Sequence, residues 1–172
     1  MRTNVAQWSL MLLCFSMAGA IGGGLYEHTV LMPLWAASPP TSFAMIQPGT
    51  GAPLQAFWIP VHVAITVCLL VSLVFTWKER KVRRWLLVGL GAYLVMRVWS
   101  GLFFIPEMLA FQQVPRDAPP SAELTARVAR WTFWRWFREP LDVTSFLALL
   151  LALFWLKRPE DSTAAPELKH AA

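Results

Sequence analysis

The sequence predicts an all-α integral membrane protein: a four-helix bundle with both termini cytoplasmic and an additional amphipathic helix before the fourth span. Hydrophobic residues make up 56% of the 172-residue chain and charged residues only 15%, whereas soluble domains carry about 25% charged residues. The apolar residues also stand in long blocks instead of the periodic stripes of a soluble helix. We therefore expect residues 1–158 to form a single domain that crosses a lipid bilayer.

The first span covers about residues 8–35. It is longer than the ~20 residues that cross a bilayer core. It is also longer than the apolar core of a cleaved secretory signal, so we expect a retained helix. Cleavage after Ala18 or Ala20 is the alternative. Residues 36–55 carry no charge and many turn-forming residues, which predicts a loop on the outer side.

The second and third spans cover about residues 57–77 and 85–106. Five basic residues stand between them, in the short segment 78–84. Because short cytoplasmic loops are enriched in Lys and Arg, this segment predicts a cytoplasmic turn. The third span then returns to the outer side.

The fourth span covers about residues 141–156 and is preceded by the amphipathic segment 121–139. Arginines alternate with aromatic residues in this segment, which predicts a helix that lies on the membrane surface or extends the fourth span. Ser121 is placed to cap its start, with Glu123 in the first turn. Segment 159–172 predicts a disordered cytoplasmic tail.

The formal net charge of +5 does not indicate nucleic-acid binding, although clustered Lys and Arg do neutralise phosphates. Here the basic residues flank apolar spans, as in cytoplasmic loops, so the expected partner is the bilayer. Cys14 and Cys68 lie in different spans without CxxC spacing, which argues against a disulfide framework.

Ionisable side chains inside the spans gather toward the predicted outer end. An ionisable group in hydrocarbon costs several kcal/mol unless it is paired or hydrated, so this distribution predicts a polar cavity open to the outer face. Arg97 has the strongest case, because a rise of ~1.5 Å per residue places it ~18 Å above the inner end of its span. It needs an anionic partner, for which the candidates are Glu27, Glu107 and Asp142.

Four of these side chains are the expected catalytic residues. Arg97 or Arg138 would stabilise a developing oxyanion, and Glu27 or His62 would transfer a proton. The residues expected around a substrate pocket are Tyr26, His28, Trp99, Glu107 and Asp142. For each there is also a structural interpretation, as an interfacial, paired or packing residue.

We expect no metal and no other cofactor. Glu27, His28 and His62 carry ligand atoms, but neighbouring helical positions point about 100° apart and no HExxH or ExxH spacing occurs. No motif supports a haem held between His28 and His62.

Two short stretches resemble the anthrone-oxygenase-like family of small membrane proteins. They are Tyr26-Glu27-His28 with Pro33, after a Gly-rich stretch, and Trp134-Arg135-Trp136-Phe137-Arg138 at the entrance to the last span. The resemblance covers roughly residues 5–158 and implies a membrane helical bundle. Characterised members of that family oxygenate anthrone-type polyketides and have no recognised metal or flavin motif. The resemblance implies the same activity for this chain. It points to Arg138 and Glu27 as site residues, while Phe137 stands where that family tends to have Asn.

Two functions are therefore expected. The first is a cofactor-independent, oxygenase-like membrane enzyme that acts on a flat, lipid-soluble molecule. The alternative is a non-catalytic accessory subunit or a binder of lipids or hydrophobic small molecules. Its GxxxG pair, Gly19 and Gly23, would contact another protein or a second copy of the chain in a homo-oligomer. The two halves of the sequence show no convincing repeat, which ranks transport lower. Short loops and basic flanks fit a bacterial inner membrane.

Overall fold

The computed structural model describes residues 2–157, which are largely helical and contain no strand. Within this part of the chain, four helices are long and apolar enough to cross a membrane. They are Asn4–Ala36, Leu54–Thr76, Arg80–Gln113 and Ala122–Lys157. The chain is thus a multi-pass membrane protein of all-helical fold, as its composition predicts. The predicted tail at residues 159–172 lies outside the described residues.

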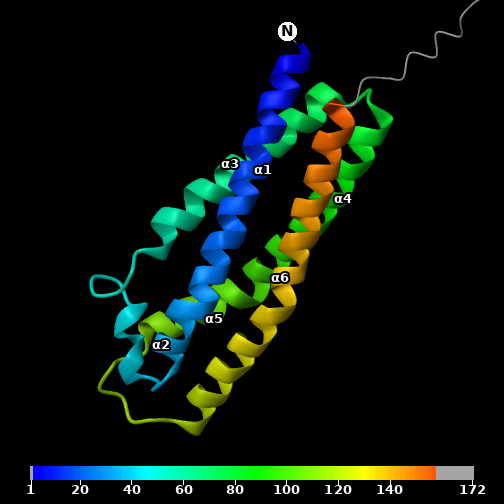
Figure 1. Ribbon diagram of the computed structural model, residues 1–172. Coiled ribbons are helices and arrows are strands. Elements are labelled where there is room, and N and C mark those ends of the chain that lie inside the picture. Colours follow the sequence, from blue (N-terminus) through cyan, green and yellow to red (C-terminus); the bar gives the residue numbers. More distant parts are fainter. Residues whose placement is uncertain (1, 158–172) are drawn as a thin grey trace, which may run out of the picture.

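The helices run antiparallel, and the bundle has two different ends (Figure 1). The N-terminus, the turn at residues 77–79 and the end of the last helix share one end, which we call the terminal end. The connections 37–53 and 114–121 lie at the other, which we call the loop end. The sequence predicts that the loop end faces the outer side of the membrane.

The first span is one helix interrupted by a π-helical turn. It consists of α1 (Arg2–Tyr26), the π turn Glu27–Leu31 and α2 (Met32–Ala36). The N–H of Met32 donates to the carbonyl of Glu27, five residues earlier. Pro33 explains the widened turn, because proline lacks an N–H and its ring crowds the carbonyl four residues before it.

The third span repeats this arrangement. It consists of α4 (Arg80–Trp99), the π turn Ser100–Phe104 and α5 (Ile105–Gln113). Pro106 is the second residue of α5, as Pro33 is the second residue of α2. Each half of the bundle therefore has a long helix with a proline-associated π turn near the loop end, paired with an antiparallel partner.

The partners are α3 (Leu54–Thr76) and α6 (Ala122–Lys157). The amphipathic segment before the fourth span is not a separate helix, because α6 is one helix of 36 residues that continues through Pro140. This is the second of the two placements that the sequence predicts. Its buried residues form one stripe at helical spacing: Leu124, Val128, Trp131, Arg135, Asp142, Ser145, Ala148, Leu149 and Ala152. Since this packed face has no break, segment 121–139 extends the fourth span. The oxygen of Ser121 accepts from the N–H of Leu124 at 3.3 Å, which is the predicted cap.

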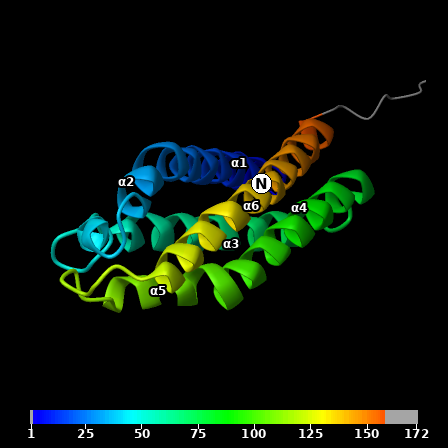
Figure 2. The ribbon, with the colours of Figure 1, turned by 90° about the horizontal axis from the view of Figure 1, so that it is seen from below.

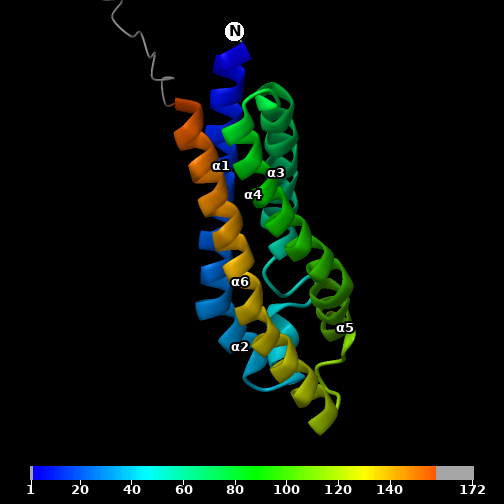
Figure 3. The same cartoon turned by 90° about the vertical axis from the view of Figure 1, so that its right-hand side faces the viewer.

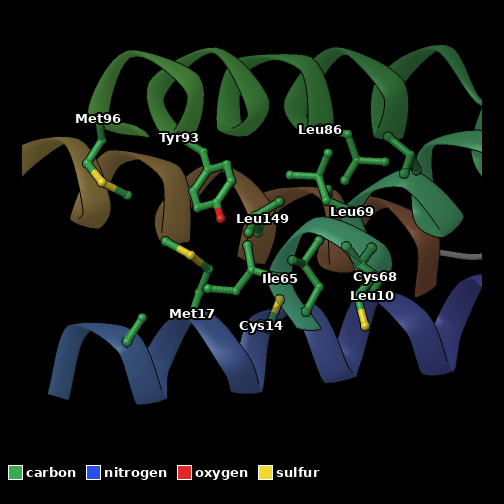
Figure 4. Close-up of a cluster of buried hydrophobic side chains, with 14 residues drawn as sticks. Leu10, Cys14, Met17, Ile65, Cys68, Leu69, Leu86, Tyr93, Met96 and Leu149 are labelled. Carbon is green, nitrogen blue, oxygen red and sulfur yellow. The ribbon is translucent and has the colours of Figure 1, made fainter. Parts of the chain in front are cut away.

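Two apolar clusters hold the bundle together. The first fills the space between the four long helices, with side chains such as Leu10, Ile65, Leu86 and Leu149 pointing inward (Figure 4). The free cysteines Cys14 and Cys68 belong to it. The second cluster lies at the loop end and is rich in aromatic rings, including Trp35, Phe43, Phe104, Phe111 and Trp131. It ties α2, α5 and the first half of α6 to the connection 37–53.

The four long helices do not pack evenly. Among the pairs of long helices that are neighbours in the bundle, α4 with α6 and α1 with α3 form the most extensive contacts, followed by α1 with α6, and α3 with α4 form the least extensive. Figure 2 shows α6 between α1 and α4. Figure 3 shows α3 and α4 leaving their shared turn together and separating toward α5. The bundle is therefore closed between α1 and α6 and loosely packed between α3 and α4.

Candidate functional site

A cavity of about 670 Å³ lies on the loosely packed side of the bundle. It is lined by α3, α4, α5, α6 and Glu27. Along α3 the lining runs from Leu54 to Val67, which corresponds to ~20 Å at ~1.5 Å per residue. Its volume falls in the range of about 300–1,000 Å³ that is typical of small-molecule sites.

The mouth of this cavity is apolar and faces sideways out of the bundle. Ile59 on α3 is 62% exposed and Ile105 on α5 is 45% exposed, although both line the cavity. The other exposed apolar lining residues are Val63, Val67 and Leu109. These side chains lie on the outer surface of helices that are apolar enough to cross a membrane. The cavity therefore opens between α3 and α5 at the side of the bundle.

The wall opposite the mouth carries a buried ion pair. Arg135 Nη2 lies 3.4 Å from Glu27 Oε2 and 3.7 Å from Glu139 Oε1, and only 3% of the Arg135 side chain is exposed. It also donates to the carbonyl of Gly24 at 3.3 Å. The indole N–H of Trp58 donates to Glu27 at 3.1 Å. Glu27, which begins the first π turn, is thus held by side chains from both α3 and α6.

A second polar group lines the same cavity. His62 Nδ1 and the Tyr93 hydroxyl are hydrogen-bonded at 3.1 Å, and the Thr66 hydroxyl lies 3.4 Å from the same Tyr93 oxygen. The rings of Trp58 and His62 are nearly parallel, with an interplanar angle of 20° and centroids 5.6 Å apart. Trp58 and His62 thus form a stacked aromatic pair in the lining of the cavity.

Two further arginines line the cavity without an ion pair. Arg138 donates to the Ser100 hydroxyl at 3.3 Å. Arg97 forms no hydrogen bond or ion pair with any described residue, so none of its three expected partners pairs with it. Glu27 pairs with Arg135, and Glu107 pairs with Arg127 at 3.0 Å. Asp142 is buried and interacts with Arg97 and Arg138 through its charge, but not within 4.0 Å.

All four residues that the sequence predicts as catalytic line this one cavity: Arg97, Arg138, Glu27 and His62. The five predicted pocket residues do not line it. Tyr26 is 57% exposed on the outside of α1, and Glu107 bridges to α6 through Arg127.

The other three predicted pocket residues are also outside the lining. His28 is buried with its ring centroid 3.9 Å from that of Trp136, and neither of its ring nitrogens has a partner. Trp99 packs against Phe104, beside the aromatic loop-end cluster. Asp142 is buried on α6.

Sequence reasoning missed the central role of Arg135. Positions 135, 138, 139 and 142 share one face of a helix, since residues three, four and seven apart are neighbours. This signal becomes visible only when segments 121–139 and 141–156 are treated as one helix. Trp58 donates to Glu27, and Tyr93 is hydrogen-bonded to His62. No sequence pattern around either residue indicated a part in the site.

Among residues 2–157, no group of three or more His, Cys, Asp and Glu side chains could hold a metal ion. Comparisons with protein-family models, with curated proteins and with solved structures found no match for this chain. The fold and the site define a helical membrane protein with a sideways-opening cavity, apolar at its mouth and charged at its inner wall.

Proposed function

We propose that this protein binds a lipid-soluble small molecule, which enters the cavity from the bilayer between α3 and α5. The observation that carries the proposal is the contrast between the two sides of the cavity. Exposed apolar side chains such as Ile59 and Ile105 form its mouth, and Arg97, Arg135 and Arg138 form its inner wall. A molecule with an apolar body and a polar end matches both.

The position of the bilayer supports this route. Trp8 and Tyr26 are exposed eighteen residues apart on α1, and Phe57 and Trp77 are exposed at the two ends of α3. Aromatic residues favour the two membrane boundaries, and ~1.5 Å per residue separates each pair by ~27–30 Å, close to the hydrocarbon thickness. We place the mouth of the cavity within the loop-end leaflet on these grounds.

The orientation is part of the proposal. The basic segment 78–84 lies at the terminal end, so we place both termini in the cytoplasm, with a bacterial inner membrane as the location. Single cysteines at Asp117 and Lys78, each exposed, test this in a Cys14→Ala, Cys68→Ala background. A membrane-impermeant maleimide should label D117C in intact cells and K78C only after permeabilisation. The reverse pattern would invert the topology.

Binding can be tested by blocking the mouth. Val63→Trp places an indole at the opening, whereas Val74→Trp adds the same ring to an exposed position on α3 outside the cavity. We expect V63W to abolish the binding of a lipid-soluble polycyclic fluorophore in nanodiscs, and V74W to bind like the unaltered protein. Equal binding by the two variants would place the ligand elsewhere.

A second candidate function is the oxygenation of a flat, anthrone-type molecule. The clustering of Arg97, Arg138, Glu27 and His62 around one cavity favours it. Glu27 or His62 would remove a proton from the ring methylene, and Arg97 or Arg138 would stabilise the enolate oxygen. Reaction with O₂ then replaces the two methylene hydrogens with one oxygen atom, and the second oxygen leaves as water.

Conversion of an anthrone to the quinone by purified protein tests this candidate. Arg138→Gln should lower the rate at least tenfold while the protein still binds the substrate. Arg130→Gln, which removes an exposed arginine of the same helix outside the cavity, is the control. A rate equal to background oxidation in the unaltered protein would leave binding as the function.

A further inference from the structure

We infer that the ligand is an amphiphile with a single carboxylate headgroup, which Arg97 and Arg138 hold at the inner wall of the cavity. This inference rests on the proposed binding function and specifies the charge of its ligand. Three arginines line the cavity, and Glu27 is its one acidic lining residue in the described chain. The lining therefore carries an excess of positive charge.

The arginine nearest to Glu27 is already occupied. Arg135 pairs with Glu27 and Glu139 and donates to the Gly24 carbonyl. Glu27 in turn accepts from Trp58. The charge of Arg135 is thus matched by carboxylates of the protein itself, although its Nε, like that of Arg138, has no partner among the described residues.

Arg138 and Arg97 have donors to spare. A guanidinium carries five N–H donors. Arg138 uses one on the neutral Ser100 hydroxyl, and its Nε is buried with no partner among the described residues. Arg97 has no hydrogen bond at all within the described chain. Because a charged group at this depth costs several kcal/mol unless it is paired or hydrated, an anion in the cavity would stabilise both side chains.

The local charge balance favours a monovalent headgroup. Arg97, Arg135 and Arg138 stand beside three carboxylates, because Glu27 and Glu139 pair with Arg135 and Asp142 is buried on α6. Arg97 and Arg138 therefore lack an anion in direct contact, although the neighbourhood as a whole is balanced. One ligand carboxylate would add a single negative charge to this group, whereas a divalent phosphate would add two in a poorly solvated site.

The rest of the cavity fits the apolar body of such a molecule. From the two arginines the space leads past the stacked rings of Trp58 and His62 to the exposed apolar residues at the mouth. The headgroup would therefore face α6, and the apolar body would extend between α3 and α5 toward the lipid.

Four ligands that share one apolar chain test this inference. A tail-labelled C16 fatty acid, its methyl ester, the corresponding primary alcohol and the alkyl phosphate are titrated against the full chain in nanodiscs. We expect the acid to bind at least tenfold tighter than the ester and the alcohol, as charge-assisted hydrogen bonds predict. Arg97→Gln and Arg138→Gln should each reduce this preference at least fivefold and leave the affinity for the ester unchanged. Arg84→Gln, an exposed position on the same helix as Arg97, should keep the full preference.

The outcomes separate this inference from the proposed function. If acid and ester bind equally and V63W abolishes both, the cavity binds lipid-soluble molecules but the carboxylate assignment is overturned. If no ligand in the series binds, or V63W has no effect, the proposed function fails as well. Tighter binding of the alkyl phosphate than of the acid would overturn the assignment of a single charge. The comparison of acid and ester in the unaltered protein needs no variant and stands even if R97Q or R138Q does not fold.

Discussion

The two halves of this bundle meet along two seams, and the seams differ. Between α1 and α6, a Cβ at Gly24 would already be in van der Waals contact with Glu139, 3.4 Å from one carboxylate oxygen, so the position has no room for a large side chain. Arg135 bridges the same seam through the Gly24 carbonyl and Glu27. Between α3 and α4 the sequence offers large side chains instead, including His62 on α3 and Tyr93 on α4, and α3 has no glycine.

The difference shows how one architecture produces both a closed and an open side. A small residue removes the steric obstacle to close approach, and a buried ion pair then fixes the two helices together. Where neither is present, long side chains keep the helices apart and enclose a cavity. The loose packing of α3 against α4 is therefore the source of the binding space.

The largest expected effect comes from breaking the closed seam at Arg135. Arg135→Gln removes the cation that pairs with the buried Glu27 and the half-buried Glu139, which should lower the free energy of unfolding by about 3–5 kcal/mol. Unfolding of detergent-solubilised protein by SDS titration measures it. Arg130→Gln, whose arginine side chain is 55% exposed, should stay within about 0.5 kcal/mol. Equal stability of the two variants would show that the ion pair does not hold the seam.

A smaller effect is expected from crowding the same seam. Gly24→Leu forces a side chain against Glu139 and Arg135 and should destabilise the fold by about 1–3 kcal/mol. Gly19→Leu is the matched control on the same helix, because a Cβ at Gly19 meets nothing within 4 Å. It should be neutral or slightly stabilising, since leucine favours helix more than glycine does. The same SDS titration compares them, and a G19L loss as large as that of G24L would contradict the assignment of the close contact.

The smallest effect is expected on the open side. Tyr93→Phe removes the hydroxyl that bonds to His62 and Thr66, and it should cost about 0.5–1.5 kcal/mol, the value of a neutral hydrogen bond. Tyr26→Phe, at an exposed position on α1, should leave stability unchanged. If Y93F were as destabilising as R135Q, the open side would contribute to stability as much as the closed seam, and the contrast between them would fail.

Hydropathy was sufficient to predict that four spans exist. Helical rise placed Arg97, Glu27 and His62 toward the same end of the spans before the fold was known. The rotation of each helix about its axis could not be predicted from the sequence, because it depends on which helices pack together. Tyr26 and His28 adjoin Glu27 in sequence but face elsewhere, since successive helical positions differ by about 100°.

The last helix shows a second limit. The amphipathic, arginine-rich segment 121–139 was set apart from the span at 141–156, and the continuity of α6 comes from tertiary packing that no local pattern reports. Once α6 is continuous, Arg127 reaches Glu107 and Arg135 reaches Glu27. Both pairs join residues that are far apart in the sequence, which is why the pairing of Glu107 and the central role of Arg135 were missed.

The π turn at Ser100–Phe104 makes the ligand site tolerant of a change in chain length. A π turn is in effect one extra residue inserted into an α-helix, and the wide turn absorbs it. Deleting a single residue there would restore α-helical spacing and leave α5 facing the same side, so Leu109 and Gln112 would stay in the lining. Deleting a residue from the regular part of α4 would instead turn α5 by about 100° about its axis. Ser100–Phe104 is thus the stretch of this span that can lose a residue while the shape of the ligand site is kept.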